Sequence, residues 1–300
     1  MGKGGRLMNE IRYGRKRSGI KKELQQKIED WLETIDDIEV RDLAAHNVIV
    51  TGGSIASMLL GEKINDYDVY FRDKETTLAV AKYYVNKFEQ QHPDESWIEV
   101  KEDTIQNIKG EEEERVLVWV QSEGIAGSDE ESDNQEECEQ QDKYRPMFLS
   151  QNAITLSDKF QIVIRFYGEP DQIHRNYDFA HAMNWYDYKE NHLELKSEAM
   201  ECLLSRTLLY RGSLYPIASL FRIKKFIERG WRISAGEQLK IAWQISEMDL
   251  TDKAVVRESL TGVDQVYLNE LIKALEDVDK DKLNSTYVGS IIDKIFGDSE

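Results

Sequence analysis

The chain has 300 residues, a formal net charge of −18 and a hydrophobic fraction of 40%, enough for one large domain or two modest ones with real cores. The acidic balance argues against non-specific wrapping of nucleic acid, and no apolar run is long enough to span a membrane. The only cysteines, Cys138 and Cys202, exclude a disulfide framework and a cysteine-rich zinc site. We therefore expect a reducing, cytoplasmic setting.

Charge is unevenly distributed along the chain. Residues 1–22 are rich in lysine, arginine and glycine and predict a basic, flexible arm. The stretch 122–143 has few apolar and many acidic residues and predicts a disordered insertion. A second basic cluster lies on a later helix, within residues 222–232. RNA could bind at the arm and at this helix, although the arm could equally bind an acidic partner or the chain's own insertion.

In chain order, helices and strands alternate until helices take over. Apolar stripes predict helices over residues 21–38 and 74–91, the second ending before His92-Pro93. Strands are expected at 47–51, around 66–71, and at 97–100, 116–121, 147–149, 153–156 and 160–166. Later helices are expected at 169–176, 197–204, 215–230, 236–246, 264–277 and 286–296. The plan is α+β over residues 23–196 and all-helical over residues 197–300.

The segment Val48–Phe71 contains a candidate metal site. Its second strand carries Asp66 and Asp68, and residues two apart on a strand face the same side. Neighbouring carboxylates repel each other unless a cation neutralises them. Mg²⁺ typically bridges one or two carboxylates to phosphate groups, so the pair predicts a site for Mg²⁺ or Mn²⁺.

The same segment contains a candidate phosphate site. A strand, a Gly-Gly-Ser turn at residues 52–54 and a helix ending at Gly61 precede the carboxylates. Gly52 and Gly53 would let phosphate oxygens approach the N–H groups of the helix N-terminus. Ser54 could cap that helix or donate to a phosphate. A phosphate site and a metal site in one segment are typical of nucleotidyl transfer.

The order of these motifs resembles the class II tRNA nucleotidyltransferase and bacterial poly(A) polymerase family, within the DNA polymerase beta-like superfamily. Its first motif is Gly-Gly, Leu-Leu-Gly and Asp-x-Asp, found here within residues 52–68. Its next motif, Arg-Asp-Phe-Thr ahead of Asn-Ala-Leu, is echoed by Tyr177-Asp178-Phe179-Ala180 and Ala182-Met183-Asn184. Its later helix, with an early proline and a terminal Gly-aromatic-x-Ile, is matched by residues 216–233. The resemblance covers roughly residues 48–233 without the insertion.

The resemblance implies a nucleotidyltransferase-type mixed sheet with flanking helices, followed by a helical neck. It implies that Asp66 and Asp68 hold two Mg²⁺ ions and that Gly53 and Ser54 hold the triphosphate of a nucleoside triphosphate. Asp178 would contact the ribose or support the metal site. Two further candidates for nucleotide binding are Arg165, with a surface salt bridge as an equal alternative, and Lys224, for which a solvated helix face is the favoured alternative.

Departures from the family pattern bear on the activity. Ala56 and Ser57 replace an Arg-Asp pair, and Gln161 stands on the strand that holds a further carboxylate in the family. The base-selecting Glu-Asp-x-x-Arg triplet is replaced by Leu214, Tyr215 and Ala218, which cannot read a base edge, so we do not expect CCA addition. An aromatic group could stack on bases but is interpreted as core: Tyr177, Phe179, Trp185, Tyr186 and Tyr188.

The sequence therefore predicts a metal-dependent nucleotidyltransferase that moves a nucleoside monophosphate from a nucleoside triphosphate to an RNA (tRNA-like) 3′-hydroxyl or a related acceptor. The alternative is a catalytically impaired member of the same fold that acts as a binding or structural protein, which Gln161 and the lost triplet favour. A third possibility is a toxin or antitoxin that modifies tRNA or protein, because the tail after Ser246 is short.

Overall fold

The computed structural model describes residues 14–92, 98–106, 110–119, 124–126 and 143–250, together with residues 255 and 259. The chain divides into two compact units, and each is considered by itself. The first unit comprises residues 1–104, 114–173 and 182–203, and the second comprises residues 105–113, 174–181 and 204–300. Predictions for residues 1–13, for residues 127–142 of the insertion, and for helices at 264–277 and 286–296 lie outside the described residues.

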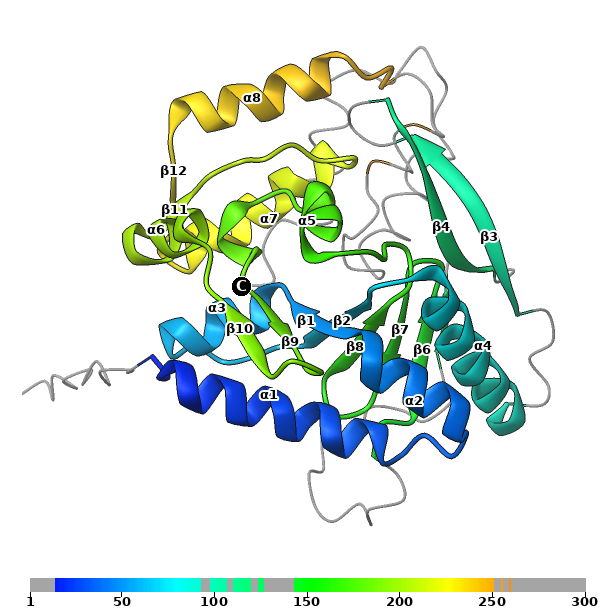
Figure 1. Ribbon diagram of the computed structural model, residues 1–300. Coiled ribbons are helices and arrows are strands. Elements are labelled where there is room, and N and C mark those ends of the chain that lie inside the picture. The colour runs from blue at the N-terminus through cyan, green and yellow to red at the C-terminus, as the bar shows by residue number, and fades with distance from the viewer. Residues whose placement is uncertain are drawn as a thin grey trace, which may run out of the picture. The chain divides into compact units, whose positions relative to one another are not determined.

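The first unit is an α+β structure on an eight-stranded mixed sheet (Figure 1). The strand order is β10-β9-β1-β2-β8-β7-β6-β5, and all neighbours are antiparallel except the parallel pair β2 and β8. The strands are β1 (Val48–Thr51), β2 (Tyr67–Phe71), β5 (Gly124–Ala126), β6 (Pro146–Ser150), β7 (Ala153–Leu156), β8 (Phe160–Val163), β9 (Trp185–Asp187) and β10 (His192–Glu194). β3 (Glu99–Gln106) and β4 (Glu112–Trp119) pair in a separate two-stranded sheet.

The helices that begin in the first unit are α1 (Arg17–Leu32), α2 (Ile38–Asn47), α3 (Gly53–Leu60), α4 (Lys74–Gln91), α5 (Pro170–Ile173) and α6 (Ser197–Ser205). Aspartate side chains define two of the starts: Asp37 accepts from the N–H groups of the first turn of α2, and Asp73 accepts from the Thr76 N–H of α4. Within the described residues, every helix is too short or too polar to cross a bilayer.

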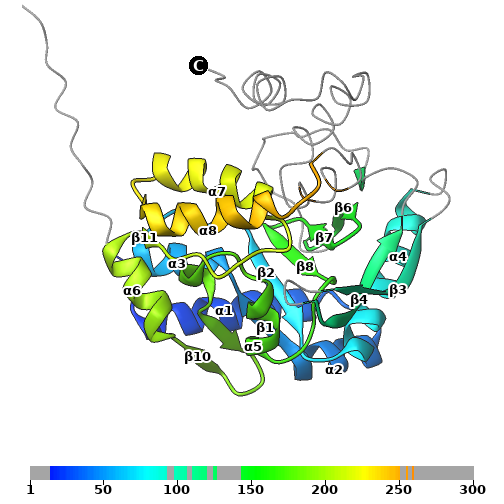
Figure 2. The ribbon, with the colours of Figure 1, turned by 90° about the horizontal axis from the view of Figure 1, so that it is seen from above.

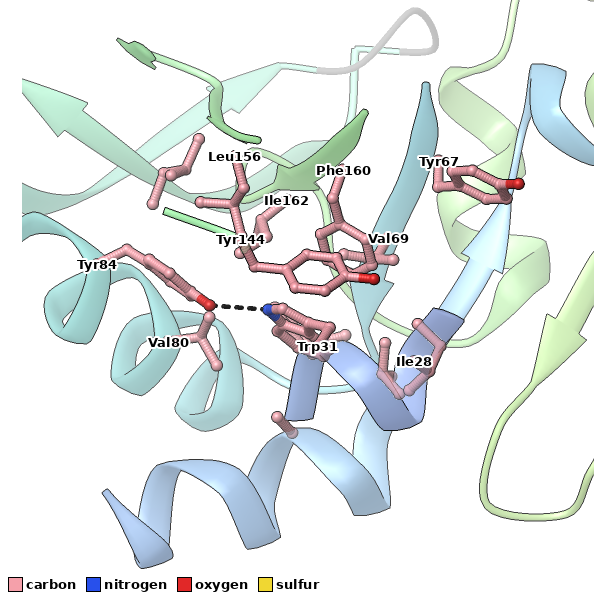
Figure 3. Close-up of a cluster of buried hydrophobic side chains, with 14 of the residues drawn as sticks. Ile28, Trp31, Tyr67, Val69, Val80, Tyr84, Tyr144, Leu156, Phe160 and Ile162 are labelled. Carbon is pink, nitrogen blue, oxygen red and sulfur yellow. Dashed lines mark hydrogen bonds between the residues drawn. The ribbon is translucent and has the colours of Figure 1, made fainter. Parts of the chain in front are cut away.

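The main core lies between one face of the sheet and helices α1, α2 and α4 (Figures 1 and 2). Trp31 of α1 is fully buried at its centre, with its ring 4.9 Å from Phe160 and 6.3 Å from Phe71. Its Nε1–H donates to the Tyr84 hydroxyl at 2.8 Å, which satisfies the indole's only donor (Figure 3). Because strand residues alternate, the residues between these core positions lie on the opposite face, called here the site face.

The second unit contains α7 (Pro216–Glu228), α8 (Ala235–Ser246) and a parallel pair of two-residue strands, β11 (Thr207–Leu208) and β12 (Arg232–Ile233). Its core includes a ring cluster in which His181 lies 4.7 Å from both Phe226 and Trp231. The prediction of an all-helical region from residue 197 is therefore wrong at β11 and β12, because strands this short leave no periodic pattern.

Other boundaries also differ from the predictions. Residues 17–22, predicted as part of the flexible arm, form the first turns of α1, where the buried Ile20 begins its apolar stripe and Arg17 donates to the Leu193 carbonyl. Residues 124–126, predicted as disordered, form β5 and pair with β6. The helix predicted at 169–176 is α5 followed by a 3₁₀ turn, His174–Asn176.

Candidate active site

The glycine turn, residues Gly52–Ser54, joins β1 to α3. Gly52 has a φ of 100°, a conformation that favours glycine, and its N–H donates to the Ala182 carbonyl at 3.1 Å. Gly52 is also the N-cap of α3, and because it has no side chain, it supplies no capping group to the first N–H groups of that helix. The helix ends at Gly61 in the left-handed conformation, as the sequence predicts.

The space and the polar groups at this turn suit an anion. A Cβ built on Gly53 would meet no atom of the described residues within 4 Å. Ser54 is 2% exposed, and its Oγ has no hydrogen-bond partner within the described part of the chain. It lies in the first turn of α3 rather than capping it, which corrects one of its two predicted roles. A buried hydroxyl left unpaired costs about 1–3 kcal/mol, and a phosphate oxygen would satisfy it.

Of the carboxylate pair, Asp68 lies on β2, whereas Asp66, predicted on the same strand, lies immediately before it. Asp68 is on the site face, because its neighbours Tyr67 and Val69 belong to the core beneath the sheet. In the parallel ladder, Gln161 of β8 is its direct partner. In the antiparallel ladder between β1 and β2, Val50 pairs with Val69. The next residue of β1, Thr51, two residues before Gly53, therefore lies opposite Asp68. The sheet thus brings the carboxylates to the edge where the glycine turn begins.

The pKa values of both carboxyl groups are raised above the ordinary value for aspartate. Burial and then the charge of Asp66 raise the pKa of Asp68 from 3.8 to about 7. Burial also raises the pKa of Asp66, although the charge of Lys159 acts in the opposite direction. A hard divalent cation would neutralise both groups, so this donor set fits Mg²⁺ or Mn²⁺. In the part of the chain that the structure describes, no three His, Cys, Asp or Glu side chains gather as a metal site, so phosphates or water would complete the coordination.

Raising the pH is expected to destabilise the metal-free protein by roughly 1–3 kcal/mol through Asp68. The folded-state pKa of about 7 exceeds the ordinary value of 3.8, so the stabilisation is complete below about pH 4 and is lost as the pH rises through 7. Urea unfolding in EDTA at several pH values, compared with the same series for Asp68→Asn, measures this contribution. Mn²⁺ should stabilise the wild type more at pH 8 than at pH 5, because it competes with the proton. Parallel pH profiles for the two proteins would contradict this prediction.

The structure does not bring Arg165 to the carboxylate pair. Arg165 lies two residues beyond the end of β8 and four beyond Gln161, the ladder partner of Asp68. It is buried, and its guanidinium donates to Asn152 Oδ1 at 3.4 Å. Asn152 lies on the turn between β6 and β7, so the role supported here is structural. A sequence cannot show this, because β8 ends at Val163 and the chain then leaves the sheet.

Asp178 and Lys224, also predicted to bind nucleotide, belong to the second unit. The Asp178 carboxylate pairs with Arg222 at 2.5 Å and accepts from the Ser219 hydroxyl at 3.2 Å. That pairing makes Asp178 a structural link between residues 174–181 and α7. Lys224 is exposed on α7. Ala218, at a position of the family's base-reading triplet, is fully buried.

Sequence reasoning missed three residues around the carboxylate pair and the glycine turn. Lys159, whose charge opposes the raised pKa of Asp66, sits on the turn between β7 and β8 with a φ of 58°. Thr51 donates to the Asn184 carbonyl at 2.9 Å, and Asn184 Oδ1 accepts from the Lys196 N–H at 2.9 Å. The only hint in the sequence is that Asn184 ends the second family-like motif. The contact of Thr51 with Asn184 joins residues 133 apart, and the contacts of Lys159 and Lys196 depend on how the strands pair, so neither kind can be found from neighbouring residues.

A family model identifies the chain. The model described as "Gabija anti-defense 2 family protein" matches residues 22–206, which include the glycine turn, the carboxylate pair and the whole eight-stranded sheet. The chain belongs to the Gabija anti-defense 2 family. The family expected from the motifs, the class II tRNA nucleotidyltransferases and poly(A) polymerases, is thus not the family to which this chain is assigned.

A curated relative and two solved structures are also similar. "Gabija anti-defense 2" of Bacillus phage SPbetaL7 is 19% identical over 242 residues, covering 80% of this chain but only 48% of the relative, so the chain spans about half the relative's length. The CCA-adding enzyme of Thermotoga maritima with tRNA has a TM-score of 0.41 at 14% identity, covering 90% of this chain and 54% of that one. The Bacillus stearothermophilus enzyme with CTP has a TM-score of 0.39 at 10% identity, covering 83% and 52%. Similarity at this level does not show an activity.

Proposed function

We propose that this family member is a metal-dependent nucleotidyltransferase whose activity counters a Gabija-type defence. The observation that supports the transfer activity is Asp68 on the site face, with Asp66 just before its strand, at the sheet edge where the glycine turn begins, together with the open space at Gly53 and the buried Ser54 hydroxyl that no described residue pairs. The family to which the chain belongs supports the anti-defence role. Both parts are tested below with the same variants.

The proposed reaction moves a nucleoside monophosphate to a hydroxyl acceptor, such as an RNA 3′-hydroxyl. The acceptor oxygen attacks the α-phosphorus, the bond to the bridging oxygen breaks, pyrophosphate leaves, and the hydroxyl proton passes to water. Asp66 and Asp68 would hold a divalent cation, which would neutralise phosphate charge and acidify the acceptor hydroxyl. The N–H groups of α3 and the Ser54 hydroxyl bind and orient the triphosphate. RNA binding by residues 1–22 or 222–232 remains part of this proposal.

Gln161 supports a second candidate function. It is the direct ladder partner of Asp68, on the strand where the sequence resemblance implies a further carboxylate, and its Nε2 donates to Thr155 Oγ1 at 3.3 Å. An amide is a weaker cation ligand than a carboxylate and cannot accept a proton from the hydroxyl acceptor. The alternative is therefore a catalytically impaired member that binds a nucleotide, or a partner, without transferring a group.

Gly53→Val is expected to weaken binding of a nucleoside triphosphate at least about tenfold, because the new side chain fills the space before the first turn of α3. The fold should persist, since none of the atoms in the described ranges lies within 4 Å of the added Cβ. Calorimetric titration with ATP and Mn²⁺ measures the change. Gly19→Val is a matched control, because Gly19 of α1 is equally unobstructed and exposed. Equal affinities for both variants would contradict the phosphate site.

The proposed function itself is tested by two measurements on the wild-type protein. The purified chain is incubated with Mg²⁺ or Mn²⁺, each labelled nucleoside triphosphate, and a pool of small RNAs and proteins from bacteria that carry a Gabija system. Phage plating on the same bacteria, with and without expression of this chain, measures the anti-defence effect. The proposal expects both labelling and increased plating. Increased plating without any labelling would favour the impaired member, and no effect in either assay would overturn both candidates.

A further inference from the structure

Trp185 occupies a distinct position on the site face. In the ladder between β1 and β9 it pairs with Thr51, whereas its neighbour Tyr186 pairs with Val50 and is fully buried in the main core. Alternation along β9 therefore places the Trp185 side chain on the same face as Asp68. The aromatic group that includes Trp185 was predicted to be core. Trp185 is only half-buried, so for this residue the prediction is wrong.

The spacing between Trp185 and Asp68 matches the length of a nucleotide. β9 and β2 lie on either side of β1, so the two residues are two strands apart, about 10 Å at the usual strand spacing. Phosphates held at the glycine turn and the carboxylate pair would leave a base within reach of β9. The indole offers a flat face for stacking that accepts any base.

The groups beside Trp185 favour a base over phosphates at this position. Glu194 of β10 is its direct partner in the ladder, and a carboxylate there repels phosphate oxygens. His192 Nε2 donates to Glu194 at 3.1 Å, and the His192 ring lies 5.8 Å from the indole at an angle of 57°. The helix N–H groups at α3 thus attract phosphate, whereas the negative charge of Glu194 on β10 repels it and favours an uncharged base there.

We infer that Trp185 is the stacking platform for the base of the nucleoside triphosphate, with Glu194 beside it as an acceptor for ribose O–H groups. This inference rests on the proposed function and adds the position and recognition of the base. Stacking without edge readout accounts for a chain that lacks the base-reading triplet at residues 214, 215 and 218. It predicts weak discrimination among the four bases.

The test compares probes with and without a base. Calorimetric titrations with ATP, CTP and inorganic tripolyphosphate, all with Mn²⁺, are made on the wild type, Trp185→Leu and Trp185→Phe. Trp185→Leu should lower the affinity for ATP and for CTP roughly tenfold, since one base stacked on an aromatic ring contributes on this scale. It should change the affinity for tripolyphosphate, which has no base, by no more than about twofold. Trp185→Phe should retain most of the affinity.

The outcomes separate this inference from the proposed function. Tripolyphosphate binding that is unchanged in Trp185→Leu shows that the phosphate site is still folded, so a selective loss of ATP affinity supports stacking. Equal losses for all three probes, or no loss for ATP, would overturn the stacking role while leaving the transferase proposal in place. A wild type that binds none of the probes would overturn the proposed function and the stacking role together.

Discussion

Asp68→Asn is expected to reduce incorporation of labelled nucleotide by at least about a hundredfold, the usual effect of removing one group that stabilises transition-state charge. The substitution keeps the shape of the side chain but removes half of the carboxylate pair that would hold the cation. The variant should fold at least as well as the wild type in EDTA at pH 8, because it removes the charge whose burial, and then whose repulsion by Asp66, raises the pKa of Asp68. Labelling by the two purified proteins, with unfolding curves for each, measures both effects.

Asp36→Asn is the matched control for this experiment. Its side chain is 91% exposed and lies 3.9 Å from Lys87, a surface pair of little energetic weight. It should retain full labelling and full anti-defence activity. Loss of labelling in Asp68→Asn together with loss of the plating effect would connect the chemistry to counter-defence. If Asp68→Asn instead kept its plating effect, the protein would act by binding, and the impaired-member alternative would be correct.

Trp31→Ala is expected to lower the free energy of unfolding by about 3–5 kcal/mol, a large part of the stability of a typical domain. Trp31 is fully buried between α1, the sheet and α4, so the substitution leaves a cavity. It also leaves the buried Tyr84 hydroxyl without the indole N–H that it accepts. Chemical denaturation of the purified variant measures the loss.

Trp243→Ala provides the comparison for this substitution. Trp243 lies on a helix as Trp31 does, but it is 66% exposed and donates to Glu247, one turn further on. Its replacement should change the free energy of unfolding by no more than about 0.5 kcal/mol, since surface substitutions rarely do more. If the two variants were equally destabilised, the core centred on Trp31 would be assigned wrongly.

The local parts of the site could be predicted from the sequence because their signals are local. The apolar stripe over residues 74–91 gives α4 with its observed bounds, and the Ser157-Asp158-Lys159 turn joins β7 and β8 as expected. The glycine turn, α3 and Asp68 on β2 follow from residue type and spacing alone. In each case the residues that determine the structure are neighbours in the chain.

The remaining parts depend on pairings between distant segments. Gln161 could be placed beside Asp68 only once β2 and β8 were known to be parallel partners in this register. Asp178, which the family resemblance implies to contact the ribose or support the metal site, pairs with Arg222, 44 residues later in the chain, and its motif does not show this contact. Strands as short as β5 and β11 carry too few residues for alternation to show.

One hydrogen bond at the glycine turn has a mechanical consequence. The chain leaves the first unit after Ile173 and returns at Ala182, and the carbonyl of that first returning residue accepts the N–H of Gly52. The backbone of the proposed phosphate site is therefore hydrogen-bonded to the residue at which the chain re-enters the first unit. Under the proposed function, a change in the backbone at Ala182 would therefore alter how phosphate is bound at the glycine turn.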